Sequence, residues 1–154
     1  MKVHRIDHVG INVNDLPAAK KFFLDFGLEM VGEGEVEGEW VDRIIGLQEV
    51  KSEVVMLRTP DGGTILELSK FHTPSDENGI QHTLANTLGI RHIAFVVDDI
   101  ETFVNKLKAN GAELIGEIEN YRNIYKLCYI RGPEGIILEL DEELRDSNLN
   151  PFER

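Results

Sequence analysis

The sequence contains an internal repeat, and this feature restricts the possible folds more than any other. Residues 6–33 (IDHVGINVNDLPAAKKFFLDFGLEMVGE) align without a gap with residues 90–117 (IRHIAFVVDDIETFVNKLKANGAELIGE), so that each position corresponds to one 84 residues later. A second match joins RTPDGGTILEL, residues 58–68, to RGPEGIILEL, residues 131–140, which is one residue shorter. A repeat of this length indicates a duplicated supersecondary unit. The chain therefore consists of two related modules.

Hydrophobic periodicity predicts the same order of elements in both modules. β-Branched and apolar runs predict first strands at residues 3–13 and 90–97. Asn14 or Asp15, and Asp98 or Asp99, are then candidate N-caps of two amphipathic helices. Three further strands are predicted near residues 29–36, 53–58 and 64–69 of the first module, and near residues 113–119, 124–131 and 136–141 of the second. Each module is thus predicted to be β-α-β-β-β, which gives an α+β fold.

The whole chain, residues 1–154, is predicted to be one domain made of modules at about 1–70 and 90–141. A linker over residues 71–89, rich in Ser, Thr, Asn, Gly and Pro, joins them, and a short acidic tail covers residues 142–154. His72 and His82 fall in this linker, where exposed loop positions are expected. The segment 38–48, which contains Trp40, is interpreted either as a short helix that covers a sheet edge or as a roof over the site.

Charge and composition exclude several classes of function. The net charge of −12 makes nucleic-acid binding improbable, because an acidic surface repels phosphate backbones. No apolar run is long enough to cross a bilayer, and the N-terminus has no apolar signal region, so a cytoplasmic protein is expected. The single cysteine, Cys128, allows no intramolecular disulfide and is expected in a strand as a small apolar residue.

Two histidines occupy matching positions in the two first strands. Strand alternation places His8 on the face that also carries Gly10, opposite the face that the amphipathic helix should cover. His92 is placed in the same way, with Ala94 two residues further on. Both imidazoles are therefore expected to point away from the helices, beside small residues that leave room for a ligand.

Two glutamates match them in the last strands. Glu67 lies between two leucines, and so does Glu139, so each carboxylate is also expected on the face away from the helix. A carboxylate in an apolar strand is costly to bury unless it is paired or bound to a cation. Two imidazoles and two carboxylates are ligands that Zn²⁺, Ni²⁺, Co²⁺, Fe²⁺ and Mn²⁺ accept. Structural roles for duplicated strand residues are the alternative, and spacing alone leaves both interpretations open.

The paired modules, the DHVGINVNDL and IRHIAFVVDDI openings and the two P-D/E-G…ILEL endings resemble the vicinal oxygen chelate (glyoxalase I, bleomycin resistance and dioxygenase) superfamily. The resemblance covers nearly the whole chain up to about residue 141. It implies cupped mixed sheets around one divalent metal ion, with ligands at the positions that are here His8, Glu67, His92 and Glu139. All four residues are able to bind a metal ion, which resembles glyoxalase I and methylmalonyl-CoA epimerase more than the metal-free drug-binding branch.

The resemblance also implies a class of chemistry. A substrate with vicinal oxygens would be chelated so that the metal stabilises an enolate, and a carboxylate, Glu139 or Glu67 with some preference for Glu139, would move the proton. A glyoxalase-like lyase or an epimerase or isomerase is therefore the leading prediction. The alternatives are an extradiol-type ring-cleavage dioxygenase and a non-enzymatic protein that binds a small molecule or drug.

Assembly and substrate contacts are predicted more broadly. The resemblance implies modules that pair within one chain or are exchanged between two chains, which leaves the assembly open, and a homodimer is the favoured prediction. Arg58 and Arg131 occupy matched positions before the turns and are expected to form salt bridges with the acidic surface, with an anchor for a substrate anion as the alternative. Neither a nucleic acid nor a membrane is an expected partner.

Overall fold

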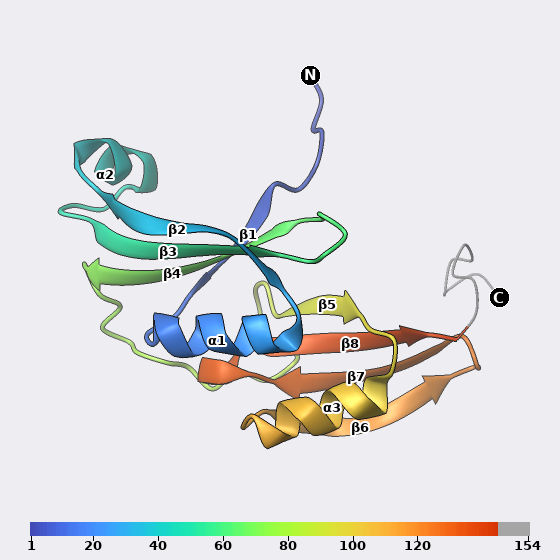
Figure 1. Cartoon of the computed structure of the whole chain (residues 1–154). Coiled ribbons are helices and arrows are strands. Elements are labelled where there is room, and N and C mark those ends of the chain that lie inside the picture. The colour runs from blue at the N-terminus through green and yellow to red at the C-terminus, as the bar shows by residue number, and fades with distance from the viewer. Residues whose placement is uncertain (145–154) are drawn as a thin grey trace. The chain divides into compact units, whose positions relative to one another are not determined.

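The structure is a computed structural model that describes residues 1–144 and divides into two compact units, Met1–Ile80 and Gln81–Arg154. The N-terminal unit contains β1 (His8–Asn12), α1 (Leu16–Phe26), β2 (Glu29–Glu37), α2 (Glu39–Ile45), β3 (Lys51–Arg58) and β4 (Ile65–Thr73). The C-terminal unit contains β5 (His92–Val96), α3 (Ile100–Ala109), β6 (Glu113–Tyr121), β7 (Tyr125–Arg131), a short 3₁₀ turn (Pro133–Gly135) and β8 (Ile137–Glu143) (Figure 1).

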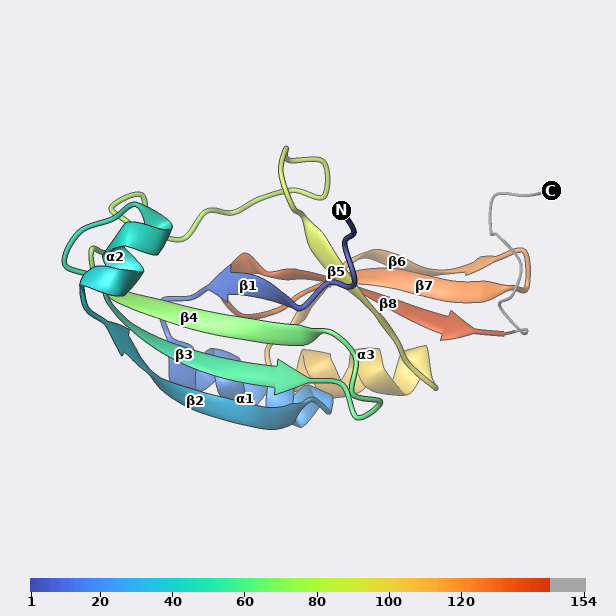
Figure 2. The same cartoon turned by 90° about the horizontal axis from the view of Figure 1, so that it is seen from above.

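Each unit is built on one mixed four-stranded sheet, as the sequence predicts. The strand orders are β1-β4-β3-β2 and β5-β8-β7-β6, with a parallel pair at β1–β4 and at β5–β8 and antiparallel pairs elsewhere. In Figure 2, β2, β3 and β4 lie side by side with α1 behind them. The two sheets therefore repeat the same topology, and the predicted α+β fold of two β-α-β-β-β modules is confirmed.

The repeat in sequence is also a repeat in structure. β1 begins at His8 and β5 at His92, and β2 begins at Glu29 and β6 at Glu113, so both pairs keep the spacing of the sequence alignment. Asp15 caps α1 by accepting a hydrogen bond from the Ala18 amide at 3.0 Å. Asp99 caps α3 through the Thr102 amide at the same distance. A side-chain oxygen that satisfies a free amide of the first turn explains why both helices begin where they do.

The core of each unit lies between its helix and one face of its sheet. In the N-terminal unit Phe23, Leu57 and Leu68 are fully buried, and in the C-terminal unit Ile100 and Leu138 are as well. Burial of such side chains contributes about 1.5–3 kcal/mol each, so this face dominates the stability of each unit. Polar strand residues that alternate with this core are directed to the other face of the sheet.

Some predicted boundaries are wrong. Residues 3–7 do not join β1, because β1 pairs with β4 alone, and the first partner in β4, Ile65, is opposite His8. At the other end, β4 continues through Thr73, so His72 lies in a strand and not in the predicted linker. Glu142 and Glu143 of the predicted acidic tail belong to β8, and residues 145–154 lie outside the described residues.

The segment around Trp40 forms a short helix, α2, which agrees with one of its two interpretations. Asp42 holds the loop between α2 and β3, because its carboxylate accepts hydrogen bonds from the amides of Glu49 at 3.0 Å and Val50 at 2.9 Å. Val41 is buried, whereas the Trp40 side chain is exposed. Across residues 1–144, none of the helices combines the length and apolar character needed to span a membrane.

Candidate functional site

The N-terminal unit brings His8 and Glu67 together on the sheet face away from α1. β1 and β4 are parallel neighbours with Gly10 directly opposite Glu67, so His8 and Glu67 occupy the same face. The distance from His8 Nε2 to Glu67 Oε2 is 3.8 Å. Ser69, two residues after Glu67, has its hydroxyl 3.4 Å from Glu67 Oε1. The side chain of Glu67 is 24% exposed, so this carboxylate is partly shielded but remains open to a ligand.

Asp7 orients the imidazole of His8. His8 Nδ1 lies 3.0 Å from Asp7 Oδ2, and Asp7 also accepts a hydrogen bond from Arg5 at 2.7 Å. The hydrogen bond to Asp7 is the main reason why the pKa of His8 is raised, and the charge of Glu67 adds to it against the opposing effect of burial. A neutral imidazole that donates from Nδ1 keeps its Nε2 lone pair free on the side of Glu67. That is the arrangement a metal-ligating histidine requires.

The C-terminal unit brings His92 and Glu139 together in the same way. Ala94 on β5 is directly opposite Glu139 on β8, and His92 shares the face of Ala94. The distance from His92 Nε2 to Glu139 Oε2 is 2.9 Å, shorter than in the first unit. Only 17% of the Glu139 side chain is exposed. The His92 ring also packs against the ring of Tyr129, with 4.9 Å between centroids.

Tyr129 and Asp141 lie beside Glu139, and neither was predicted from the sequence. Tyr129 on β7 is directly opposite Glu139, and its hydroxyl forms a hydrogen bond with the Glu139 carboxylate. Burial, followed by the charge of Glu139 and this hydrogen bond, raises the pKa of Tyr129. Burial and the neighbouring charge of Glu139 likewise raise the pKa of Asp141 to about 6. Strand alternation from Glu139 could have found Asp141, but Tyr129 depends on the register between β7 and β8.

The donor atoms of each pair suit a divalent metal ion. Two ligands at about 2.0–2.2 Å from one ion lie roughly 2.8–3.6 Å from each other. The separation of 2.9 Å in the C-terminal pair falls in this range. The separation of 3.8 Å in the N-terminal pair is slightly longer, and a small side-chain rotation would bring it into the range. The structure thus brings His8 to Glu67 and His92 to Glu139, each pair within one unit.

A group of three carboxylates at the start of α3 has a different explanation. Asp99, Glu101 and Glu142 have oxygens within 4.8 Å of one another. However, Asp99 caps the helix, Glu142 accepts a hydrogen bond from the Ile100 amide at 3.0 Å, and Lys126 forms ion pairs with Glu101 at 2.9 Å and with Glu142 at 3.7 Å. Helix amides and one lysine therefore compensate these charges, and the group stabilises the helix end.

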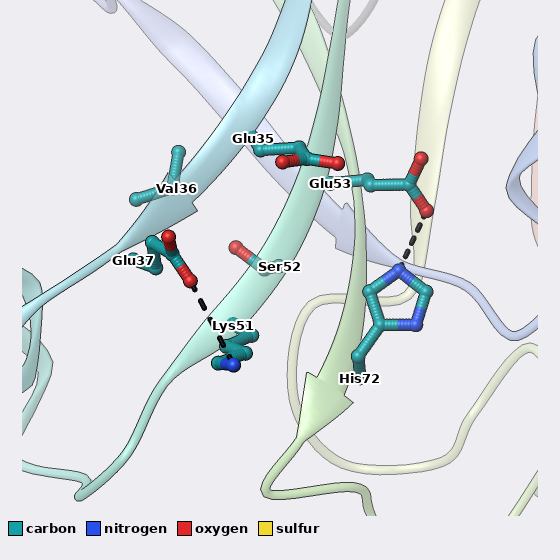
Figure 3. Close-up of a pocket in the computed structure, with 7 residues that line it drawn as sticks. All are labelled: Glu35, Val36, Glu37, Lys51, Ser52, Glu53 and His72. Atoms are coloured by element: carbon teal, nitrogen blue, oxygen red, sulfur yellow. Dashed lines mark hydrogen bonds and ion pairs between the residues drawn. The ribbon is translucent and has the colours of Figure 1, made fainter.

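Residues of β2, β3 and β4 line a pocket in the N-terminal unit (Figure 3). Glu35 and Glu53 are directly opposite on β2 and β3, and Glu53 forms an ion pair with His72 Nε2 at 2.6 Å. Lys51 faces Glu37 at 4.0 Å. Alternation along β3 from the buried Val55 and Leu57 places Glu53 on the helix side of the sheet, away from Glu67. His72 is thus a partly exposed strand residue outside the predicted ligand set.

The two matched arginines do not form the salt bridges that were predicted from the sequence. Among residues 1–144 no ion pair involves Arg58 or Arg131. Arg131 instead donates a hydrogen bond to the Gly135 carbonyl at 3.2 Å and so closes the turn before β8. Arg58 is exposed at the end of β3.

Comparison with known proteins agrees with this architecture. The family model described as the Glyoxalase/Bleomycin resistance protein/Dioxygenase superfamily matches residues 5–140. The chain belongs to this superfamily. The match includes all four predicted ligands and both sheets except the last three residues of β8, so the resemblance found in the sequence is confirmed.

Individual superfamily members show how far the similarity extends. The uncharacterised protein YwbC of Bacillus subtilis (strain 168) is 31% identical over 138 residues, which cover 88% of this chain and 94% of YwbC. The crystal structure of a glyoxalase family protein from Bacillus cereus is 44% identical, with a TM-score of 0.90 over 94% of this chain and 97% of that chain. The trypanothione-dependent glyoxalase I of Leishmania major, 22% identical, shares the fold with a TM-score of 0.65 over 92% of this chain and 88% of its own.

Proposed function

We propose that this superfamily member is a metal-dependent enzyme, a glyoxalase I-like lyase or an epimerase or isomerase, in which His8, Glu67, His92 and Glu139 bind one divalent metal ion. The observation that carries the proposal is the matched pair of imidazole and carboxylate in each unit, both on the sheet face away from the helix. Zn²⁺, Ni²⁺, Co²⁺, Mn²⁺ and Fe²⁺ all accept such ligands.

The surroundings of the four side chains support a role in binding. On the parallel neighbouring strand, each carboxylate lies opposite a small residue, Gly10 on β1 or Ala94 on β5, so that no large side chain covers it from that strand. Each also has a hydrogen-bonding neighbour, as ligating carboxylates usually do.

The chemistry follows from the donor set. A bound divalent ion would act as a Lewis acid toward the vicinal oxygens of a small-molecule substrate and stabilise the negative charge that develops on them. Glu139 would take a proton from the carbon beside the substrate carbonyl and return it to the adjacent carbon. Glu139 is preferred over Glu67 because it is the less exposed of the two. The histidines would remain ligands throughout.

Metal content tests this proposal directly. Protein without a histidine tag is incubated separately with Ni²⁺, Co²⁺, Zn²⁺ and Mn²⁺, desalted and measured by elemental mass spectrometry. One equivalent per chain is expected, and His8→Ala and His92→Ala should each abolish it, whereas His72→Ala should retain it. Less than about one-tenth of an equivalent contradicts the proposal, because a site with four ligands should retain its ion. Two equivalents, each lost only with its own histidine, would contradict a shared site.

Substrate assays then separate the classes of reaction. Methylglyoxal with several thiols tests the lyase, and a 2-methyl-branched acyl-CoA tests the epimerase. A catechol under oxygen with Fe²⁺ or Mn²⁺ tests the dioxygenase alternative. Binding of cationic or hydrophobic drugs by metal-free protein, without turnover of any substrate, would favour the non-enzymatic alternative.

We also propose that the protein is a homodimer. Large apolar side chains along the segment that joins the units are more than half exposed in the single chain, namely Ile80, Leu84, Leu88 and Ile90. A second copy of the chain would cover such a patch. Light scattering after size-exclusion chromatography should give twice the monomer mass of 17.4 kDa, and a monomer at micromolar concentration contradicts this part of the proposal.

A further inference from the structure

The C-terminal ligand pair has a neighbour that the N-terminal pair lacks. Tyr129 is directly opposite Glu139 on the adjacent strand, whereas the residue directly opposite Glu67 is Met56. A tyrosine hydroxyl donates a hydrogen bond, and a methionine thioether does not. The two units therefore differ at the position directly opposite the carboxylate on the antiparallel strand.

Tyr129 contacts both members of its pair. Its hydroxyl donates a hydrogen bond to the Glu139 carboxylate, and its ring packs against the His92 imidazole at 4.9 Å between centroids with a tilt of 39°. His92 Nε2 and Glu139 Oε2 are 2.9 Å apart, whereas His8 Nε2 and Glu67 Oε2, which have Met56 in the place of the tyrosine, are 3.8 Å apart. A single side chain thus restricts the torsions of a carboxylate and the plane of an imidazole.

We propose that Tyr129 is a positioning residue for metal binding, which holds Glu139 and His92 in the separation and orientation of bound ligands before the ion arrives. This inference rests on the proposed function. A hydrogen-bonded carboxylate has fewer orientations to lose when it binds a cation, and outer partners of this kind typically change metal affinity by about 10- to 100-fold. The C-terminal pair is then the more preorganised half of the site.

The test compares Tyr129→Phe with Tyr125→Phe. Both changes remove one hydroxyl from β7, but Tyr125 is opposite Glu143, four residues away from Tyr129. Co²⁺ is titrated into metal-free protein, and both the dissociation constant and the visible absorption band of the bound ion are recorded. Thermal unfolding of the metal-free proteins is measured in parallel.

For Tyr129→Phe we expect a dissociation constant about 10- to 100-fold higher and a shifted Co²⁺ band, with Tyr125→Phe within about twofold of the wild type. If Tyr129→Phe leaves both the Co²⁺ dissociation constant and the absorption band unchanged, the inference is overturned. A lower unfolding temperature of the metal-free variant would then indicate a structural role alone. Equal weakening by both variants would also overturn it. If the wild-type protein binds no Co²⁺, the proposed function itself fails, which is a separate result.

Discussion

In the N-terminal unit an aspartate contacts the imidazole of the candidate pair, whereas in the C-terminal unit a tyrosine contacts both the imidazole and the carboxylate. Asp7 accepts a hydrogen bond from the His8 ring at 3.0 Å, and the residue at the matching position in the second unit is Arg91. Tyr129 donates a hydrogen bond to Glu139, and the residue at the matching position in the first unit is Met56. The two units thus have the same types of candidate ligand and differ in the residues around them.

The largest expected effect separates the two carboxylates. Glu139→Gln should lower the turnover of a substrate found in the assays proposed above by about 10²- to 10⁴-fold, because the amide cannot accept the proton. Glu67→Gln should lower the turnover by a smaller factor when both variants are saturated with metal. Steady-state rates and bound metal are measured on the same samples. The assignment of Glu139 as the proton carrier is wrong if Glu67→Gln is the more damaging change.

The next effect concerns the histidine that Asp7 orients. Asp7→Asn should weaken metal binding by about tenfold, because the Nδ1 partner of His8 loses its charge. It should also lower the pKa of His8, which the hydrogen bond to Asp7 raises. In the metal-free wild type, the contribution of charged His8 to stability is present below its unfolded pKa and is lost as pH rises through the raised folded pKa.

Proton NMR of the histidine ring resonances of metal-free protein follows this titration, and isothermal calorimetry measures the metal affinity. In the wild type, affinity should fall as pH decreases through the pKa of His8, because the proton and the ion compete for the imidazole. Asp7→Asn should move that fall to lower pH. A pH profile identical in both proteins would show that Asp7 does not control His8.

A smaller effect is expected at Asp141, which lies where the first unit has Ser69. The pKa of Asp141 is raised to about 6, so its folded state binds a proton more tightly than its unfolded state does. Its contribution to stability is therefore complete below the unfolded pKa of about 3.8 and is lost as pH rises through about 6. Asp141→Asn should raise the melting temperature of metal-free protein at pH 7.5 by roughly 2–4 °C and remove this pH dependence. An equal or lower melting temperature of Asp141→Asn would contradict a destabilising effect of the charged Asp141 carboxylate at this pH.

The smallest effect is expected at Cys128, which packs opposite Leu140 on the helix side of its sheet as Val55 packs opposite Leu68 in the other unit. Burial raises the pKa of the thiol to about 11, and the side chain is only 3% exposed. Cys128→Val should change the free energy of unfolding by less than about 1.5 kcal/mol. The native thiol should react with a disulfide reagent only after unfolding, and rapid labelling of the folded protein would refute its buried placement.

The repeat and the strand period allowed much of this molecule to be predicted. An offset of 84 residues between His8 and His92 places both on equivalent strands, and alternation from the flanking apolar residues assigns the face. Cys128 is buried in β7, as its apolar neighbours predict. The strand ends were predicted less well. β1 is shorter than its apolar run because pairing, which depends on a distant strand, limits its length.

The sequence by itself determined the two modules, the order of their elements and the face of each sheet that carries the candidate ligands. These features depend on periodicity, which is local and can be read along the chain. Only the tertiary structure decided that Tyr129 rather than another residue of β7 is opposite Glu139, and that His72 pairs with Glu53. Those contacts depend on the register between strands and on side-chain torsions, which packing of the whole sheet selects and no local pattern encodes.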